Sequence, residues 1–414
     1  MNTTQLTPLP EITEDRLVAL FNELGLGKVH MAARQPGDWL GLAQTYPERV
    51  ASLSIVCPSA LMVEAGAHLT DRLQVIVGDQ SLNVAVIQQS LANLPEARQA
   101  WISNYASLLW SDVITEQEAT IGNALKDLIT DQEAKEPLEI VDLPEGEGEI
   151  AGIRYDVRGS GLPLVLFPLG LAPNQWDALI PTLSEQYCTI TLSGAYLGMV
   201  PMLEARGKTT GYQQMLATML AEVNLQAGET VLEVGCGTGV IDRWLAHRTQ
   251  GANPIIGVDF NPYLLREATV LARQDGCQDI IDFQEGNAEN LPLPDNHVDV
   301  AISSTVMEEV DADKMLAEMI RVTKPGGRVG VIVRAMDMPR LFNIPVDPAL
   351  KARVEVAAEA QAEGAGCSSV SLYRRFQQSE LIDVTGQPLL AVFGDAYSTV
   401  GQFILGSTAT MFTA

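Results

Sequence analysis

Apolar residues recur along the chain with two different periods, and these periods predict alternating helices and strands. Over residues 14–24 they recur every three or four positions, as on one face of a helix. Short, nearly continuous apolar runs predict strands over residues 28–33, 51–56 and 73–77, and a helix over residues 38–46 ends before a proline. Strands that alternate with helices are typical of a parallel sheet in an α/β fold.

Residues 130–149 interrupt this alternation. The segment holds eight acids against one lysine, together with two prolines and two glycines. Such a composition repels itself and stays solvated, so it predicts a linker. The alternation then resumes, and we expect strands over residues 152–157, 164–167 and 189–192 and a helix over residues 176–187.

A second boundary lies at residues 206–211, where the strand pattern is lost before a helix predicted over residues 212–223. We find no internal repeat along the chain that would indicate a solenoid. The sequence therefore predicts four parts, namely residues 1–129, the acidic linker 130–149, residues 150–205 and residues 206–414.

Length and charge narrow the classes of function. With 414 residues, of which 47% are apolar, the chain is long enough for two or three domains with their own cores. Its net charge of −26 argues against binding to nucleic acid or to an anionic membrane surface. No apolar run approaches the length of a membrane span, and the first residues lack the pattern of a secretion signal. We therefore expect a cytoplasmic protein.

The cysteines and histidines do not form a known metal or disulfide pattern. The five cysteines are scattered and contain no C-x-x-C, and the four histidines include no H-E-x-x-H pair. Reduced thiols and the absence of a metal site are the expectation.

A glycine-rich turn after a buried strand carries the clearest chemistry. The apolar run over residues 230–234 is followed by Gly235-Cys-Gly-Thr-Gly239 and then by a helix predicted over residues 240–248. Glycine allows the backbone to turn sharply and to approach a ligand closely. The spacing is G-x-G-x-G, whereas dinucleotide sites use G-x-G-x-x-G. Glu233 lies two residues before the first glycine, where an acid suits a ligand with an ammonium group rather than a phosphate.

This stretch, VLEVGCGTG, resembles motif I of the class I S-adenosylmethionine (SAM)-dependent methyltransferases. Further motifs of that family follow in order: a strand ending at Asp259, a loop with Asn287, a strand over residues 299–306 and a Pro-Gly-Gly turn within residues 321–333. The similarity covers about a third of the chain, and it is greatest to the branch with the ubiquinone and menaquinone C-methyltransferases. It implies a Rossmann-like, seven-stranded methyltransferase domain.

The resemblance also implies a cofactor and the residues that hold it. In the family, the acid at Asp259 accepts hydrogen bonds from both ribose hydroxyls. Asn287 stands where the family usually has an aspartate that contacts the adenine amino group, and its carbonyl can still accept that hydrogen bond. SAM is the expected cofactor and S-adenosylhomocysteine its product. The residues expected to bind it are Glu233, Gly235, Cys236, Gly237, Gly239, Asp259, Phe260, Asn287, Ala288 and Ser303.

The expected reaction is an in-line displacement at the sulfonium methyl with a small organic molecule as acceptor. Glu308 and Glu309, just beyond the fourth strand, are the candidate catalytic bases, although two acids there also suit the start of a solvated helix. Tyr212, Arg334 and Asp337 are candidates for the acceptor pocket. A SAM-binding protein without catalysis is the non-enzymatic alternative.

The first two hundred residues resemble the α/β-hydrolase fold in a permuted order. LVALFNELGLGKVHMAARQPGDWLGLAQTYPERVASLSIVCP is similar to the family's helix, nucleophile strand, following helix and next strand. LQVIVGD is similar to a later strand, whereas IRYDVRGSGLPLVLFPLGLAPNQWDALIPTLSEQY is similar to the family's beginning.

The catalytic parts of a hydrolase are missing from this region. Ala32-Ala33-Arg34-Gln35-Pro36 stands in place of the G-x-S-x-G nucleophile elbow. The resemblance therefore implies an α/β-hydrolase-like domain lacking catalytic residues, which packs on its neighbour, covers a pocket or forms a homodimer. A hydrolase with newly recruited catalytic residues is the alternative enzyme.

The tail after residue 338 predicts a helix over residues 348–361, a short helix over residues 372–376 and a strand over residues 389–393. Such a return strand would complete a seven-stranded sheet with one antiparallel member. The last residues, GSTATMFTA, lack a capping signal, which suggests that the chain is truncated.

Overall fold

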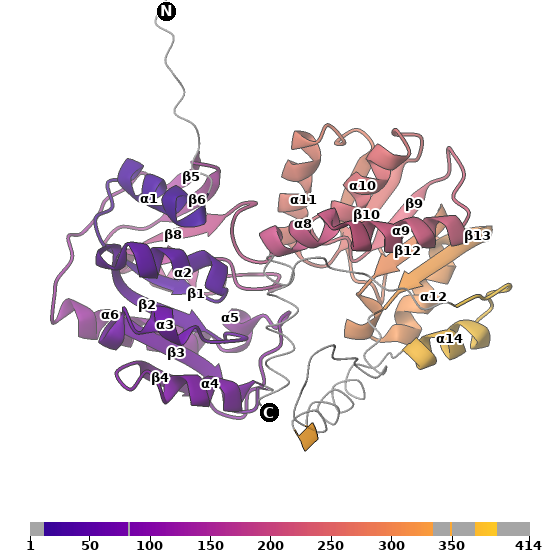
Figure 1. The fold of residues 1–414 in the computed structure, drawn as a ribbon. Helices are drawn as coiled ribbons and strands as arrows, with labels where there is room; N and C mark the ends of the chain where they lie inside the picture. The colour runs from indigo at the N-terminus through magenta and orange to yellow at the C-terminus, as the bar shows by residue number, and fades with distance from the viewer. Residues whose placement is uncertain (1–11, 82, 334–347, 350–368, 387–414) are drawn as a thin grey trace, which may run out of the picture. The chain divides into compact units, whose positions relative to one another are not determined.

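The chain divides into two compact units, Met1–Pro201 and Met202–Ala414, each built around one sheet (Figure 1). The computed structural model describes residues 12–81, 83–333, 348–349 and 369–386. None of the helices in these ranges has the length and apolar character needed to cross a bilayer.

The first unit contains an eight-stranded sheet in the order β4-β3-β2-β1-β7-β8-β6-β5. The strands from β4 to β8 are parallel, whereas β6 runs antiparallel to both β8 and β5. The bounds are β1 Val29–Ala33, β2 Val50–Val56, β3 Leu73–Gly78, β4 Arg98–Ile102, β5 Gly146–Ile150, β6 Ile153–Arg158, β7 Leu162–Leu166 and β8 Tyr187–Ser193.

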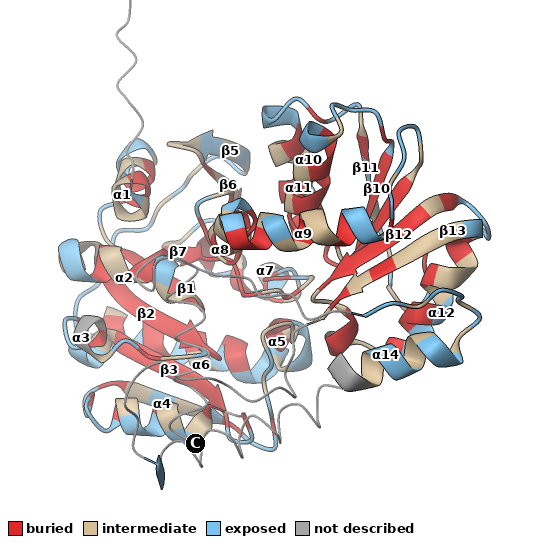
Figure 2. Cartoon of the chain, turned by 45° about the vertical axis from the view of Figure 1, so that its right-hand side comes forward, coloured by how far each residue is buried: buried red, intermediate tan, exposed pale blue. Residues whose placement is uncertain are grey.

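Helices cover both faces of this sheet. One apolar core joins Leu17 and Phe21 of α1 and Trp39 of α2 to the strands, and a second joins Ile121 and Leu125 of α6 to the opposite face. Because β1 and β2 are covered on both sides, they are buried along their whole length (Figure 2). The helices are α1 Thr13–Glu23, α2 Pro36–Thr45, η1 Pro47–Arg49, α3 Val63–Gly66, η2 Thr70–Arg72, α4 Val84–Leu91, α5 Val113–Glu116, α6 Glu118–Glu133 and α7 Ile180–Leu183.

Two expectations for the first unit need correction. The acidic segment 130–149 is not wholly a linker, because α6 continues to Glu133 and β5 begins at Gly146. Its ends are fixed by the buried face of α6, which includes Ile129, and by the pairing of β5 with β6. The helix expected over residues 176–187 is limited to α7, because Tyr187 already pairs with β7 as the first residue of β8.

The second unit contains a five-stranded, fully parallel sheet within the described residues, in the order β11-β10-β9-β12-β13. The chain builds outwards from β9 to β11 and then returns to add β12 on the other side. Ligands bind at such a reversal, beyond the carboxyl ends of the strands. The bounds are β9 Val231–Val234, β10 Ile255–Asp259, β11 Ile281–Glu285, β12 Val298–Ser304 and β13 Thr323–Ile332.

Apolar faces on the helices hold this sheet between two cores. Leu216 of α9 and Leu245 of α10 pack in one core, whereas Met315 and Met319 of α12 pack in the other. The helices are α8 Val200–Lys208, α9 Thr210–Glu222, α10 Val240–Arg248, α11 Pro262–Gln274, η3 Met307–Glu309, α12 Ala312–Val322 and α14 Ser369–Gln378. The short helix predicted over residues 372–376 is confirmed as part of α14, whereas the predicted strand 389–393 and the predicted helix beyond residue 349 lie outside the described residues.

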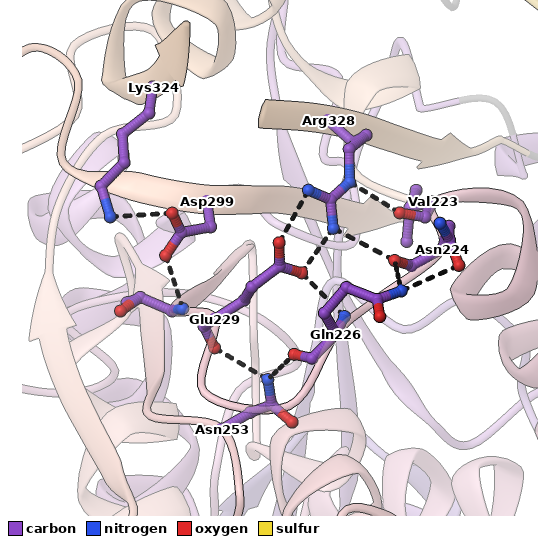
Figure 3. A network of polar contacts seen from close by, with 9 residues as sticks. Val223, Asn224, Gln226, Glu229, Asn253, Asp299, Lys324 and Arg328 are labelled. Atoms are coloured by element: carbon purple, nitrogen blue, oxygen red, sulfur yellow. Dashed lines mark hydrogen bonds and ion pairs between the residues drawn. The ribbon is translucent and has the colours of Figure 1, made fainter. Parts of the chain in front are cut away.

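Charged residues join the amino ends of the strands in this unit (Figure 3). Arg328 of β13 donates from Nε to the Val223 carbonyl at 2.8 Å and from Nη1 to Glu229 at 2.9 Å. Asp299 of β12 accepts from the Thr230 amide at 2.9 Å and from Lys324 at 2.8 Å. The end of α9 and the starts of three strands are thereby held in one polar network.

Candidate SAM site at the carboxyl ends of the second sheet

The turn after β9 requires glycine at three positions. Gly235, Gly237 and Gly239 have φ angles of 78°, 54° and 67°, which residues with a Cβ rarely adopt. A Cβ on Gly235 would lie 2.3 Å from Val306 Cγ2, and one on Gly239 would lie 2.5 Å from Phe283 Cζ. At Gly237 the nearest atom would be Leu203 Cδ1, at 3.9 Å. The outer two glycines therefore allow tight packing, whereas a Cβ on the middle one would meet a single atom at ordinary van der Waals distance.

Asp259 ends β10 beside this loop. Its Oδ2 accepts a hydrogen bond from the Gly237 amide at 2.8 Å, and its Oδ1 accepts one from the Asn261 amide at 2.9 Å. The carboxyl is buried, and burial raises its pKa while the backbone donors lower it. Each carboxylate oxygen can accept a second hydrogen bond, so Asp259 can bind two further donors, such as a pair of hydroxyls.

Two more acids lie buried beneath the loop. Glu233 of β9 is in register with Gly257 of β10, and a Cβ on Gly257 would lie 2.8 Å from Oδ2 of Asp242. Burial raises the pKa of Asp242 to about 7 and that of Glu233 well above its ordinary value, with Asp242 adding to the effect on Glu233. A cationic ligand would be stabilised here. Asp242 was missed by the sequence analysis, although it is an acid on the inner face of a predicted helix.

A chain of polar contacts holds the loop from the side of α8. Thr238 donates from Oγ1 to Glu204 Oε1 at 2.7 Å, and Arg243 donates from Nη1 to the Thr238 carbonyl at 2.6 Å. Arg243 also pairs with Glu204 and, from Nε at 2.9 Å, with Asp275. Glu204 and Arg243 are both buried. No sequence motif points to Glu204, because it lies 34 residues before Thr238 in a stretch without a clear pattern.

The remaining residues expected at the SAM site surround this loop in different environments. Ser303 is buried and donates to the Val234 carbonyl at 2.8 Å, so its hydroxyl joins β12 to β9. Burial raises the pKa of Cys236 well above its ordinary value, which keeps its thiol neutral. Phe260 is 49% exposed. Asn287 is exposed, precedes the half-buried Ala288, and accepts from the Glu289 amide at 2.8 Å.

The expected catalytic and acceptor residues are only partly brought together. Glu308 in η3 is buried and Glu309 is half-buried, just beyond β12. Tyr212 of α9 is buried, with its hydroxyl 3.1 Å from Ser304 Oγ, so it is fixed in the core beside β12. Arg334 and Asp337 lie outside the described residues.

Comparison with known proteins decides the class of this domain. Residues 232–331 match the profile of a family described as "Methyltransferase domain". They form a methyltransferase domain. The matched span of the methyltransferase domain includes the glycine loop, Asp259 and Glu308.

Curated relatives of the methyltransferase domain match less than a third of this chain. A demethylmenaquinone methyltransferase from Lactobacillus johnsonii is 34% identical over 112 residues, which are 27% of this chain and 46% of that protein. Methyltransferase GfsG from Streptomyces halstedii is 32% identical over 120 residues, 29% of this chain and 42% of that protein. The chain thus spans less than half the length of these relatives.

Solved structures include a SAM-dependent methyltransferase from Aquifex aeolicus. It aligns with a TM-score of 0.33 at 19% identity, over 43% of this chain and 86% of its own chain.

Proposed function

We propose that the protein transfers the methyl group of SAM to a small organic acceptor. The observation that carries this proposal is the buried Asp259 carboxylate, which is held by the Gly237 and Asn261 amides at the end of β10 and keeps acceptor capacity for two hydroxyls. The order of the five parallel strands, with the loop at the reversal point between β9 and β12, supports the same function.

The residues present fit SAM in charge. Asp259 would hold the ribose, Gly237 has no Cβ to hinder close approach, and Glu233 with Asp242 would face the ammonium group. Phe260 and Asn287 follow the ends of β10 and β11 and would flank the adenine. When bound, SAM supplies a methyl group on a positively charged sulfur, which makes that carbon electrophilic.

This chain's own contribution to the reaction is orientation and proton transfer. The loop, fixed by Thr238 and Arg243, would hold the donor so that the acceptor attacks in line with the breaking bond. Glu308 lies buried beyond β12, at the edge where the acceptor would enter, and would remove the acceptor's proton. The relatives named for demethylmenaquinone and ubiquinone/menaquinone methylation support an organic acceptor of the quinone type.

Calorimetry with Asp259→Ala tests the proposed SAM site. We expect at least a 100-fold loss of SAM affinity, about 3 kcal/mol, because two charge-assisted hydrogen bonds are removed. Asp282→Ala, at an exposed carboxylate on β11, is the matched control and should bind like the unsubstituted protein. Failure of the unsubstituted protein to bind SAM would overturn the proposal.

The role of Glu308 is separable from that of its neighbour. We expect Glu308→Gln to lower kcat by about 10²-fold or more with unchanged SAM affinity, and Glu309→Gln to change kcat little. The measurement is methyl transfer from labelled SAM into small molecules of a metabolite extract. Equal effects of the two substitutions would contradict the assignment of the base to Glu308.

We also propose that the first unit is a permuted α/β-hydrolase-like scaffold without a hydrolase site. The support is its largely parallel eight-stranded sheet, which ends in an antiparallel β5–β6 hairpin, and the resemblance of its segments. Arg34 follows β1 where a nucleophile would stand, and a guanidinium cannot attack a carbonyl. Ester hydrolysis of a nitrophenyl substrate that is lost in Arg34→Met would contradict this proposal.

A further inference from the structure

The carboxyl ends of three neighbouring parallel strands meet at one edge of the first unit's sheet. Arg34 directly follows β1, Cys57 directly follows β2, and Gly170 lies four residues beyond β7. A Cβ on Gly170 would lie 3.3 Å from Nη1 of Arg34, so these segments are in contact. This edge is the place where parallel α/β sheets bind their ligands.

Arg34 is enclosed at this edge with part of its guanidinium unpartnered. The residue is 3% exposed, and Nη2 donates to the Leu108 carbonyl at 2.7 Å. Within the described part of the chain, Nε and Nη1 have no hydrogen-bond acceptor although they are buried. A buried guanidinium stays charged and is costly without an anion beside it, because its donors lose water and gain nothing in return.

The side chains nearest to Arg34 do not supply that anion. Burial raises the pKa of the Cys57 thiol, which keeps it neutral. Glu116 accepts a hydrogen bond from the Tyr105 hydroxyl at 2.6 Å and is itself exposed to solvent. Among the described residues, no carboxylate forms an ion pair with Arg34, so its charge is uncompensated at contact distance.

We propose that Arg34 is the centre of a binding site for a small oxyanion, a carboxylate or phosphate group of a metabolite, in the first unit. The guanidinium presents N–H donors in a planar arrangement that matches two oxygens of such a group. The helix α2, which begins at Pro36, adds the positive end of its dipole from two residues away. Because Nη2 already donates to the Leu108 carbonyl, the ligand would bind at the unpartnered Nε and Nη1 donors.

Thermal unfolding of the full chain, followed by tryptophan fluorescence, tests this site. Four of the five tryptophans, at positions 39, 101, 110 and 176, lie in the first unit, so the signal reports mainly on that unit. Sodium phosphate and sodium acetate are compared with sodium chloride at equal ionic strength. We expect one or both anions to raise the midpoint by about 3–6 °C at ten times their dissociation constant.

Two variants of Arg34 separate this site from general ion effects. Arg34→Met should lose the response to anions and should unfold at a higher temperature than the unsubstituted protein in chloride, because an uncompensated buried charge is removed. Arg34→Lys keeps the charge without the planar donors and should respond more weakly than arginine.

Three results would overturn the proposal: no anion response in the unsubstituted protein, an equal response in Arg34→Met, or a lower midpoint of Arg34→Met in chloride. The last would mean that Arg34 is a structural residue. SAM affinity, measured on the same variants, should stay unchanged, so failure here is distinguishable from failure of the methyltransferase proposal.

Discussion

The two sheets share a parallel α/β architecture but place opposite charges at their carboxyl ends. In the second unit the strands β9 and β10 end beside buried acids, Glu233 and Asp259, with glycines between them. In the first unit a buried arginine, Arg34, directly follows β1, and the residues after it form no glycine-rich loop. We infer that the side chains at the carboxyl ends of the strands, rather than the sheet itself, would select the charge of a ligand.

The glycine loop is the largest difference between the carboxyl ends of the two sheets. The substitution Gly235→Ala would disrupt this loop. The substitution combines a left-handed backbone with a Cβ 2.3 Å from Val306, so we expect a loss of roughly 2–5 kcal/mol in unfolding free energy and of SAM binding. Gly228→Ala has a similar φ of 87° but meets no atom within 4 Å, so it should cost only about 1–2 kcal/mol. Calorimetric unfolding measures the loss of stability in each variant, and titration with SAM measures the loss of binding. If Gly235→Ala and Gly228→Ala lose equal stability, the contact with Val306 does not contribute.

Each unit contains a buried aspartate with a raised pKa. Asp38 in the first and Asp242 in the second are fully buried, and burial raises the pKa of each to about 7. The folded state then keeps a proton that the unfolded chain has released, so stability falls as pH rises from about 4 to about 7 and levels off above.

The unfolding free energy should therefore depend less on pH in the variants Asp38→Asn and Asp242→Asn. We expect each substitution to reduce the loss of stability between pH 5 and pH 8 by about 2–3 kcal/mol in the unit that carries it. Calorimetric unfolding across this pH range is the measurement. Glu96→Gln, at an exposed carboxylate, should leave the profile as it is. A profile that neither aspartate variant changes would show that these groups are not the source of the pH dependence.

The smallest expected effect on SAM affinity comes from the hydrogen bond that holds the glycine loop against α8. Thr238→Val removes the hydroxyl that donates to Glu204, and we expect SAM affinity to fall about 3–10-fold, equivalent to about 1 kcal/mol. Thr218→Val removes a hydrogen bond to the Gln214 carbonyl within α9 and should leave SAM affinity unchanged. If both variants bind SAM alike, the contact with Glu204 does not position the loop.

Local patterns predicted the second unit more fully than the first. The helix over residues 240–248 has the predicted bounds because the glycines fix its start, and Asp259 ends its strand as predicted. In the first unit the strand β4 and the helices α4 and α6 were not predicted. The acidic composition around residue 130 concealed the apolar face of α6, which includes Leu128 and Ile129.

Long-range contacts explain what sequence reasoning could not find at the sites. Glu204 reaches Thr238 and Arg243 only because α8 folds back on the loop, and no local pattern encodes that meeting. The sequence pattern identified Arg34 only as part of the segment that stands in place of a hydrolase nucleophile elbow. Its burial beneath the Leu108 carbonyl depends on a segment 74 residues away.

The network around Arg328 has a consequence for how this domain can change over evolution. Its contacts with Val223 and Glu229 join elements at the amino ends of the strands, opposite to the loop and Asp259. Substitutions that adapt the carboxyl ends to a new acceptor would therefore leave these contacts intact. The domain can be diversified at one end of its sheet, in nature or in directed evolution, while the other end preserves the fold.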